Sequence, residues 1–242
     1  MMIVLPPSET KAQGGSCGPL DLGSLAFPAL NAVRESILAD LSALPVNEAL
    51  GVLGISEKLR GDAQANQELI TSPTMPAIFR YTGVLFDALD AASLPAAALP
   101  RLVVGSALFG LVRAEDLIPR YRLSGGTKLP STTGATPTMK ARWGKVISEE
   151  LAREELVVDL RSGAYQQLGK VPDAVVVRVE SVRPDGSRKV VSHFNKQYKG
   201  TLARVLALSP QEASSAAEVV DIAAEAGLEM EMTSPTALTL VV

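Results

Sequence analysis

Apolar residues recur at helical spacing through the first third of the chain. In residues 29–44 they fall three or four positions apart, which places them on one face of a helix. Two further helical stretches, residues 49–53 and 57–70, are separated by the short segment 54–56. The pattern therefore predicts one amphipathic helix, followed by a pair of helices joined by a tight turn.

Short apolar runs alternate with these helical stretches. Residues 3–5, 101–104 and 156–160 are compact and apolar, and the first of them ends at a pair of prolines. Runs of this length are typical of buried strands. Residues 124–138 show no period and predict a long loop, which is uncommon in a compact domain unless the loop has a task.

The last part of the chain predicts a hairpin and a closing pair of strands. Asp185 and Gly186 form a strong turn signal between apolar runs at residues 173–182 and 189–193. The remaining elements are helices over residues 139–152, 194–208 and 210–227, the last capped by Ser209-Pro210, and strands over residues 228–232 and 236–242. Together these elements predict one α/β (mixed α+β) domain over residues 1–242, with a mixed sheet and surrounding helices.

Charge is unevenly distributed along the chain. The formal net charge is −3, yet residues 113–145 hold seven Lys or Arg against two acids, whereas residues 211–232 hold six acids and no Lys or Arg. A region of one sign can steer an oppositely charged partner even when the whole protein is mildly acidic. We therefore expect a positive region that can attract an anionic partner.

The cysteine content and the first residues bear on the cell compartment. With a single cysteine, Cys17, the chain cannot form an internal disulfide. The N-terminus has no basic segment, and proline at residue 6 interrupts its apolar run, so it predicts neither a signal peptide nor a membrane span. We expect a cytoplasmic protein without a membrane partner.

Residues 50–60 resemble a helix-hairpin-helix element, in which a turn presents backbone N–H groups to a DNA phosphate. Gly54 would form the turn, and a helix that starts at Ser56 would offer unpaired amides beside Lys58. Ser56 is also an ordinary helix cap, so a plain helical turn remains the alternative.

A second basic feature lies on the predicted helix 194–208. Lys196, Lys199 and Arg204 fall within one arc, opposite an apolar face formed by Phe194, Tyr198, Leu202, Val205 and Leu206. This basic face is either a solvated surface or an anion-binding one. Gly200 lies beside it and would allow close approach of a ligand or of another backbone.

Other chemistry is sparse in the sequence. His193 is the only histidine, and no second His or Cys lies at metal-ligand spacing, so we predict no His/Cys metal site. No glycine pattern matches a nucleotide fingerprint, and we predict no cofactor. Tyr121 and Trp143 lie among the basic residues, where they either stack on bases or anchor their elements in the core.

Several motifs, spread nearly end to end, carry a family resemblance. They are Leu5-Pro-Pro-Ser8-Glu-Thr10-Lys11, Ile55-Ser-Glu-Lys58-Leu, Tyr81-Thr-Gly83, the block of residues 105–123, Lys128, Trp143-Gly144, residues 159–165 and residues 192–200. In these motifs the chain resembles the YaaA family of bacterial peroxide-stress proteins. One departure is that Lys199 stands where the best-known members carry an arginine, and a lysine offers a point charge in place of a two-pronged guanidinium.

The resemblance implies a single α/β domain with a positively charged cleft, a helix-hairpin-helix element and binding of double-stranded DNA. It also implies a role in limiting free intracellular iron, and hence oxidative DNA damage, during hydrogen peroxide stress. Under this leading hypothesis the DNA phosphates contact six cations, which are Lys58, Arg113, Arg122, Lys128, Lys196 and Lys199.

The alternative is an enzyme that holds a small anionic substrate, a nucleotide or a carboxylate, in the same cleft. Polar residues scattered along a chain are what an enclosed pocket needs. Its candidates are Ser8, Lys11, Tyr121, Arg122, Lys128, Tyr165, Lys196 and Lys199, with no catalytic role assigned to any of them. The two hypotheses differ in geometry, because a duplex needs an open groove at least about 10 Å wide whereas a small substrate needs a cavity.

Overall fold

The structure is a computed structural model, which describes residues 1–191 and 194–242. Its centre is a sheet in which seven strands run in the order β4-β3-β1-β6-β7-β10-β9, while an eighth, β8, pairs with β7. The strands are β1 (Met2–Leu5), β3 (Leu102–Ser106), β4 (Gly110–Arg113), β6 (Val157–Asp159), β7 (Val175–Val182), β8 (Arg188–Val190), β9 (Glu229–Ser234) and β10 (Ala237–Val241). Two short strands, β2 (Met75–Pro76) and β5 (Leu117–Ile118), pair separately.

Strand β1 lies at the point where the order of the sheet reverses. It pairs in parallel with β3 on one side and with β6 on the other, and β7 pairs in parallel with β6 and β10. All four residues of β1 are buried, as expected for a central parallel strand. Open α/β sheets bind ligands at the carboxyl ends of their strands at such a switch point. The segment after β1 is therefore the expected position of a binding site.

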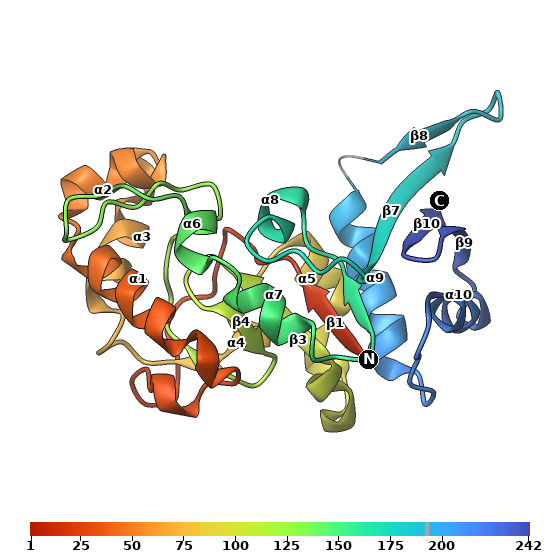
Figure 1. Cartoon of the computed structure of the whole chain (residues 1–242), viewed down its shortest axis with the longest axis horizontal. Helices are drawn as coiled ribbons and strands as arrows, with labels where there is room; N and C mark the ends of the chain where they lie inside the picture. The colour runs from red at the N-terminus through yellow and green to blue at the C-terminus, as the bar shows by residue number, and fades with distance from the viewer. Residues whose placement is uncertain (192–193) are drawn as a thin grey trace.

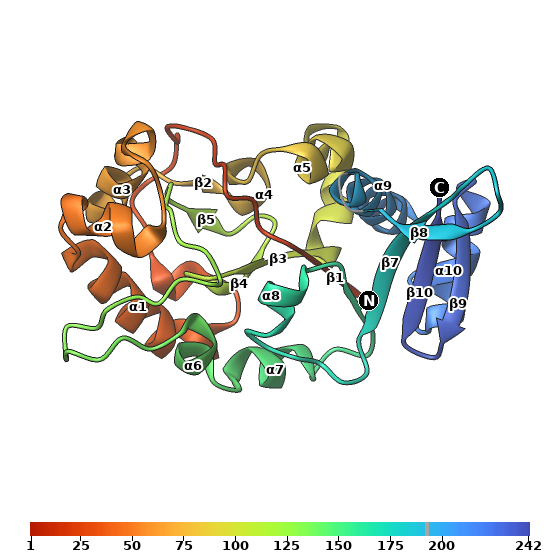
Figure 2. The ribbon, with the colours of Figure 1, turned by 90° about the horizontal axis from the view of Figure 1, so that it is seen from above.

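The helices surround the sheet and extend the molecule at one end. They are α1 (Asn31–Ala43), α2 (Val46–Leu53), α3 (Arg60–Ala65), α4 (Ala77–Arg80), α5 (Val84–Leu89), α6 (Met139–Trp143), α7 (Val146–Leu151), α8 (Gly163–Gln166), α9 (Asn195–Leu208) and α10 (Ala216–Glu225). Helices α1 to α3 gather at one end of the elongated molecule, and β9, β10 and α10 lie at the other (Figure 1). The segment after β1, α5, α8 and the start of α9 lie between these ends (Figure 2).

Gly200 is where helix α9 crosses helix α5. A Cβ atom at this position would lie 2.2 Å from the backbone oxygen of Leu85 and 2.9 Å from the Cβ of Ala88. Any side chain would therefore push the two helices apart. The close approach predicted for Gly200 is confirmed, and the partner is another backbone. This contact fixes the basic residues of α9 relative to α5.

The sequence predicted the mixed α/β sheet and the β7–β8 hairpin, and both are confirmed. Three helix predictions are wrong. The stretch 57–70 holds only the short helix α3, between 3-10 helices at Glu57–Leu59 and Asn66–Glu68. Residues 139–152 form two helices, because Gly144 takes a positive φ of 54° and ends the first. The last helix begins at Ala216 and not at residue 210, because Ser215 and Glu218 cap it: the Ser215 hydroxyl accepts from the Glu218 amide, and the Glu218 carboxylate accepts from the Ser214 amide.

The aromatic residues of the basic stretch belong to the core. Tyr121 is 2% and Trp143 1% exposed, and the Trp143 indole donates to the backbone oxygen of Ala107 at 2.9 Å. Neither ring is therefore presented to a base. The apolar face predicted for helix α9 is buried at Leu202 and Leu206, but Phe194 is 53% exposed, because it precedes the first turn of α9.

Candidate functional site

Two cavities adjoin each other at the carboxyl end of β1. The first has a volume of about 240 Å³ and the second about 290 Å³. Both are lined by Pro6, Pro7, Glu9 and Lys196. The first is completed by Ser8, Thr10, Thr82, Gly83, Val84, Leu85 and Phe86, and the second by Leu160, Ser162, Tyr165, Asn195 and Lys199. The site thus forms at the switch point of the sheet, from segments that are far apart in the sequence.

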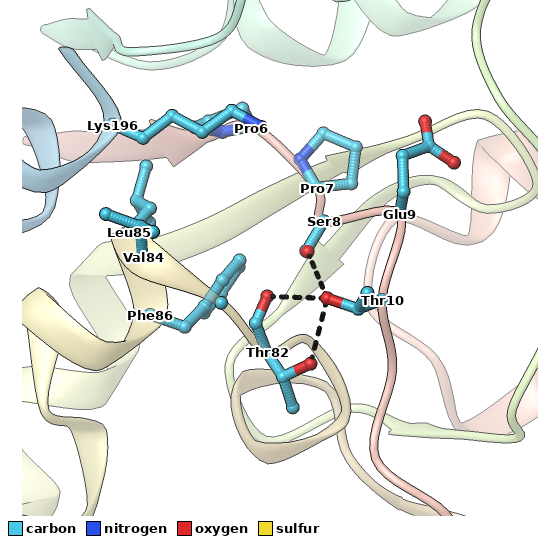
Figure 3. Close-up of a pocket in the computed structure, with 11 residues that line it drawn as sticks. Pro6, Pro7, Ser8, Glu9, Thr10, Thr82, Val84, Leu85, Phe86 and Lys196 are labelled. Atoms are coloured by element: carbon cyan, nitrogen blue, oxygen red, sulfur yellow. Dashed lines mark hydrogen bonds between the residues drawn. The ribbon is translucent and has the colours of Figure 1, made fainter. Parts of the chain in front are cut away.

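Hydroxyl groups line one side of the first cavity (Figure 3). The Ser8 and Thr10 hydroxyl oxygens are 3.0 Å apart, and the Thr82 hydroxyl donates to that of Thr10 at 3.1 Å. Gly83 turns the chain into helix α5 with a φ of +101°, a conformation that other residues rarely adopt. The start of α5 supplies an apolar side opposite the hydroxyls, formed by Val84, Leu85 and Phe86.

The second cavity is cationic. Lys199 is partly buried and its ammonium group donates to the backbone oxygen of Leu160 at 3.1 Å. Burial lowers the pKa of Lys199, and the charge of Asp159 opposes that shift. Lys196 is exposed and lies one turn earlier on α9, so both ammonium groups border the same space. The first residues of α9 also carry the positive end of its helix dipole, which favours an anion here.

Uncharged polar groups complete the second cavity. The Tyr165 hydroxyl accepts a hydrogen bond from the Gly125 amide at 3.1 Å, and burial raises the pKa of this phenol, so it stays protonated and can donate. Asn195 opens helix α9, and its side-chain oxygen is buried without a hydrogen-bond partner in the described part of the chain. An orphaned buried acceptor at a cavity wall is uncommon and is typical of a place that a ligand or water completes.

Lys11 lies just behind the first cavity. Its ammonium group donates to the Ser8 backbone oxygen at 2.9 Å and lies 4.2 Å from the centre of the Tyr121 ring and 5.3 Å from that of Tyr81. Burial lowers the pKa of Lys11 to about 7, with the charge of Glu9 opposing the shift. Lys11 is therefore a positive charge next to the site that titrates near neutral pH.

The tyrosines beneath Lys11 form a buried chain of hydroxyl groups. The Tyr81 and Tyr121 hydroxyls are 2.8 Å apart, and that of Tyr121 is 2.7 Å from the Ser106 hydroxyl at the end of β3. Burial raises the pKa of Tyr81 to about 12. Tyr121 therefore supports Lys11 from within the core and does not line either cavity.

Most arginines of the basic stretch are neutralised by acids that lie elsewhere in the sequence. Arg120 pairs with Asp62, and Arg122 lies 3.9 Å from the same carboxylate. Arg142 pairs with Asp40 at 2.7 Å. Arg122 also approaches the carboxylate of Glu9 at 3.4 Å, which compensates the one acidic charge that borders both cavities. The positive charge left to the site therefore comes mainly from lysines.

The predicted helix-hairpin-helix residues lie away from the cavities, at the end of the molecule that holds α2 and α3 (Figure 2). Gly54 ends α2 in the left-handed conformation, at a φ of +64°. Ser56 precedes a 3-10 helix, Glu57–Leu59, without a side-chain cap, and Lys58 is exposed. The element after the turn is thus a single 3-10 turn that leads into the short helix α3, and its role in DNA binding stays a prediction.

Three other candidates also lie outside the cavities. Arg113 donates to the backbone oxygen of Pro100 at 2.8 Å and lies over the Phe27 ring. Lys128 is exposed and its backbone pairs with that of Thr138 across the long loop. Arg204 donates to the backbone oxygens of Leu89 and Asp90, and so ties α9 to the end of α5.

The structure thus brings together Ser8, Lys11, Arg122, Tyr165, Lys196 and Lys199, with Tyr121 beneath them. His193 lies outside the described residues.

Known proteins resemble this sequence along almost the whole chain. A family model described as "Peroxide stress protein YaaA" matches residues 1–232. The chain belongs to the YaaA family. The family resemblance seen in the motifs is confirmed, and an association with peroxide stress follows from it.

Several bacterial proteins share much of this sequence. A UPF0246 protein of Corynebacterium glutamicum is 68% identical over 232 residues, which cover 96% of this chain and 95% of that protein. One of Corynebacterium efficiens is 65% identical over the full length of both proteins, and one of Streptomyces coelicolor is 44% identical over 97% of this chain and 94% of its own.

The described residues contain neither a metal-type cluster nor a membrane-spanning helix. No group of three or more His, Cys, Asp or Glu side chains lies together as a metal site would require in residues 1–191 and 194–242. Within the same residues, no helix is both long and apolar enough to cross a membrane.

Proposed function

We propose that this member of the YaaA family serves the peroxide-stress response by binding a small anionic ligand in the two cavities at the carboxyl end of β1. One observation carries the proposal: Lys196 and Lys199 of α9 and Tyr165 of α8 converge on one cavity beside the loop that holds Ser8. Such convergence is the mark of a pocket for a small molecule.

The distribution of charge supports a small ligand over a duplex. A DNA duplex is bound by unpaired cations spread along an open surface, since each neutralised phosphate contributes to affinity. Here Arg120, Arg122 and Arg142 are engaged by carboxylates, whereas Lys196 has no acceptor in the described part of the chain and Lys199 has a backbone oxygen alone. The positive charge available at the cavities therefore comes from Lys196 and Lys199.

The experiment is a calorimetric titration of the protein with inorganic phosphate, sulfate and citrate, beside a titration with duplex DNA at low salt. We expect saturable binding of at least one small anion with one site per chain. If none of the three anions binds, the proposal is wrong, whatever the result with DNA.

The affinity for sulfate is expected to weaken as the pH rises from 6 to 9. The pKa of Lys11 is lowered to about 7 by burial, so its positive charge is present below that pH and is lost above it. Burial also lowers the pKa of Lys199, so its charge is lost at a lower pH than that of an ordinary lysine. Sulfate keeps a constant charge over this range, so a change in its affinity reports on the protein. In a Lys11→Met variant the step near pH 7 should disappear, and an unchanged profile would show that Lys11 does not contribute.

Duplex DNA is the second candidate, and one observation favours it. Gly54 forms a left-handed turn, with Ser56 and Lys58 exposed beside it, as phosphate contact through backbone amides requires. If this turn binds DNA, a Lys58→Ala variant should bind duplex DNA more weakly and with a less steep dependence on salt. Lys140→Ala, at an exposed lysine on α6, is the matched control. If both variants lose the same affinity for duplex DNA, the DNA is attracted by net charge and not by the turn at Gly54.

The cellular role is tested separately from binding. The family resemblance implies that free iron and oxidative DNA damage are limited during peroxide stress, and we propose that this effect depends on the ligand held by the cavities. A host strain that lacks the gene should regain peroxide survival with the wild-type gene but not with a Lys196→Ala, Lys199→Ala double variant. Full rescue by the double variant would contradict the link.

A further inference from the structure

The two adjoining cavities differ in chemistry. The second presents two ammonium groups and a phenol, from Lys196, Lys199 and Tyr165. The first presents an apolar wall at the start of α5 and a group of hydroxyls on the opposite side. Lys196 lines both, and in Figure 3 its side chain reaches from α9 toward Pro6, which also lines both cavities. A ligand that fills both must therefore carry an anionic part and an apolar part.

The apolar wall is suited to a flat ring. Phe86 lines the first cavity, and its ring stacks on that of Tyr81 with centroids 5.6 Å apart and planes inclined by 21°, which holds it in a fixed orientation. Val84 also lines this cavity and is 51% exposed, so its apolar surface is available. Aromatic and aliphatic walls of this kind favour stacking of a nucleobase.

The hydroxyl groups on one side of the first cavity can hydrogen-bond with the edge of a base or with the hydroxyls of a sugar. Ser8, Thr10 and Thr82 hydrogen-bond with one another at 3.0–3.1 Å. A hydroxyl both donates and accepts, so each of these groups can rotate to meet a sugar hydroxyl or a ring nitrogen. The first cavity therefore combines apolar packing with adaptable hydrogen bonding, as sites for nucleosides do.

We propose that the anionic ligand is a nucleoside monophosphate, with its phosphate in the second cavity and its nucleoside in the first. This inference rests on the proposed function and narrows it. The cavities, at about 240 and 290 Å³, are each small for a whole nucleotide, but together fall within the range of about 300–1,000 Å³ that such ligands occupy.

Glu9 sets the number of phosphates. Glu9 lines both cavities, and its carboxylate lies 3.4 Å from the Arg122 guanidinium. The two lysines match the charge of a single phosphate group, whereas the further charges of a triphosphate would face the Glu9 carboxylate. A monophosphate is therefore preferred over a triphosphate.

The experiment compares AMP, CMP, ribose 5-phosphate, inorganic phosphate and ATP by calorimetric titration of the full chain. We expect the better of AMP and CMP to bind about tenfold or more tightly than ribose 5-phosphate, because base stacking adds to the phosphate contacts. ATP should bind more weakly than AMP. If inorganic phosphate and ribose 5-phosphate bind as tightly as both monophosphates, the anion site stands but this inference is overturned. If none of the five binds, the proposed function fails with it.

Two variants assign the halves of the ligand to the two cavities. Val84→Asn should lower the affinity for the monophosphate several-fold and leave the affinity for inorganic phosphate unchanged. Val182→Asn, at a valine on β7 that is also 51% exposed, is the matched control and should change neither. An equal effect of Val84→Asn on both ligands, or none on either, would overturn the assignment of the nucleoside to the first cavity.

Discussion

Replacing Lys196 and Lys199 together by alanine is expected to lower the affinity for inorganic phosphate and for AMP about 100-fold, because a hydrogen bond to a charged group is worth about 1.5–3 kcal/mol. The two ammonium groups border the same cavity, and Lys199 is partly buried there, where solvent screens its charge less than at the surface. Calorimetric titration of the double variant measures the loss directly.

The control for this experiment removes the same charge elsewhere. Lys140 on α6 and Lys189 on β8 are exposed and line neither cavity. A Lys140→Ala, Lys189→Ala variant should bind phosphate nearly as well as the wild type. If the two double variants lose affinity equally, the anion is attracted by net charge alone and the site assignment is wrong.

Replacing Arg161 by methionine is expected to lower the free energy of unfolding by about 3–5 kcal/mol, as breaking a buried ion pair does. Arg161 is 2% and Asp159 3% exposed, and the guanidinium donates to both carboxylate oxygens at 2.9 and 2.8 Å. It also donates to the backbone oxygen of Gly169 at 2.8 Å. The variant leaves the Asp159 carboxylate buried without its counter-charge. Urea unfolding followed by circular dichroism measures the change.

A double variant, Asp159→Leu with Arg161→Met, separates the ion pair from packing. It should regain much of the lost stability, because no buried charge is left unpaired. Arg178→Met, which breaks the exposed pair with Glu180 on β7, should change stability little. An Arg161→Met variant as stable as Arg178→Met would contradict the account of how the carboxyl end of β6 is held.

Regular elements of the fold follow from local pattern. The helix at Asn31–Ala43 repeats its apolar residues every three or four positions, and the hairpin turn at Asp185 and Gly186 has its own local signal. The local sequence pattern does not predict where the last helix begins, because two helix-start signals lie close together there. Ser209-Pro210 and Ser215 are both acceptable starts for the last helix, and Glu218 decides for Ser215 through the bond it makes to the preceding backbone.

The site is only partly visible in the sequence. Helical spacing places Lys196 and Lys199 on one face, and motifs single out Ser8 and Tyr165. Helix α5, which supplies the apolar wall of the first cavity, was missed, because the one signal there is Gly83 in the family motif and an apolar helix start is typical of ordinary core. The site also depends on the close crossing at Gly200, where the glycine predicts a close approach but not that helix α5 is the partner.

The charge of the basic stretch shows the same limit. The sequence places Arg120, Arg122 and Arg142 in a run of net positive charge, but Asp62 and Asp40, which pair with them, lie far earlier in the chain. The net charge of a sequence stretch does not count acidic residues from elsewhere in the chain that the fold brings next to it. The arginines of the stretch therefore add little free positive charge, and the charge that lines the cavities comes from Lys196 and Lys199 of α9.

The central claim, that the cavities at the carboxyl end of β1 bind an anion, is tested most directly by following backbone amide NMR signals during titration with inorganic phosphate. We expect saturable shifts at Ser8, Tyr165, Lys196 and Lys199, with little change around Gly54 and Lys58 at the far end of the molecule (Figure 2). Saturable shifts confined to the turn at Gly54, or no saturable shifts at all, would contradict the account.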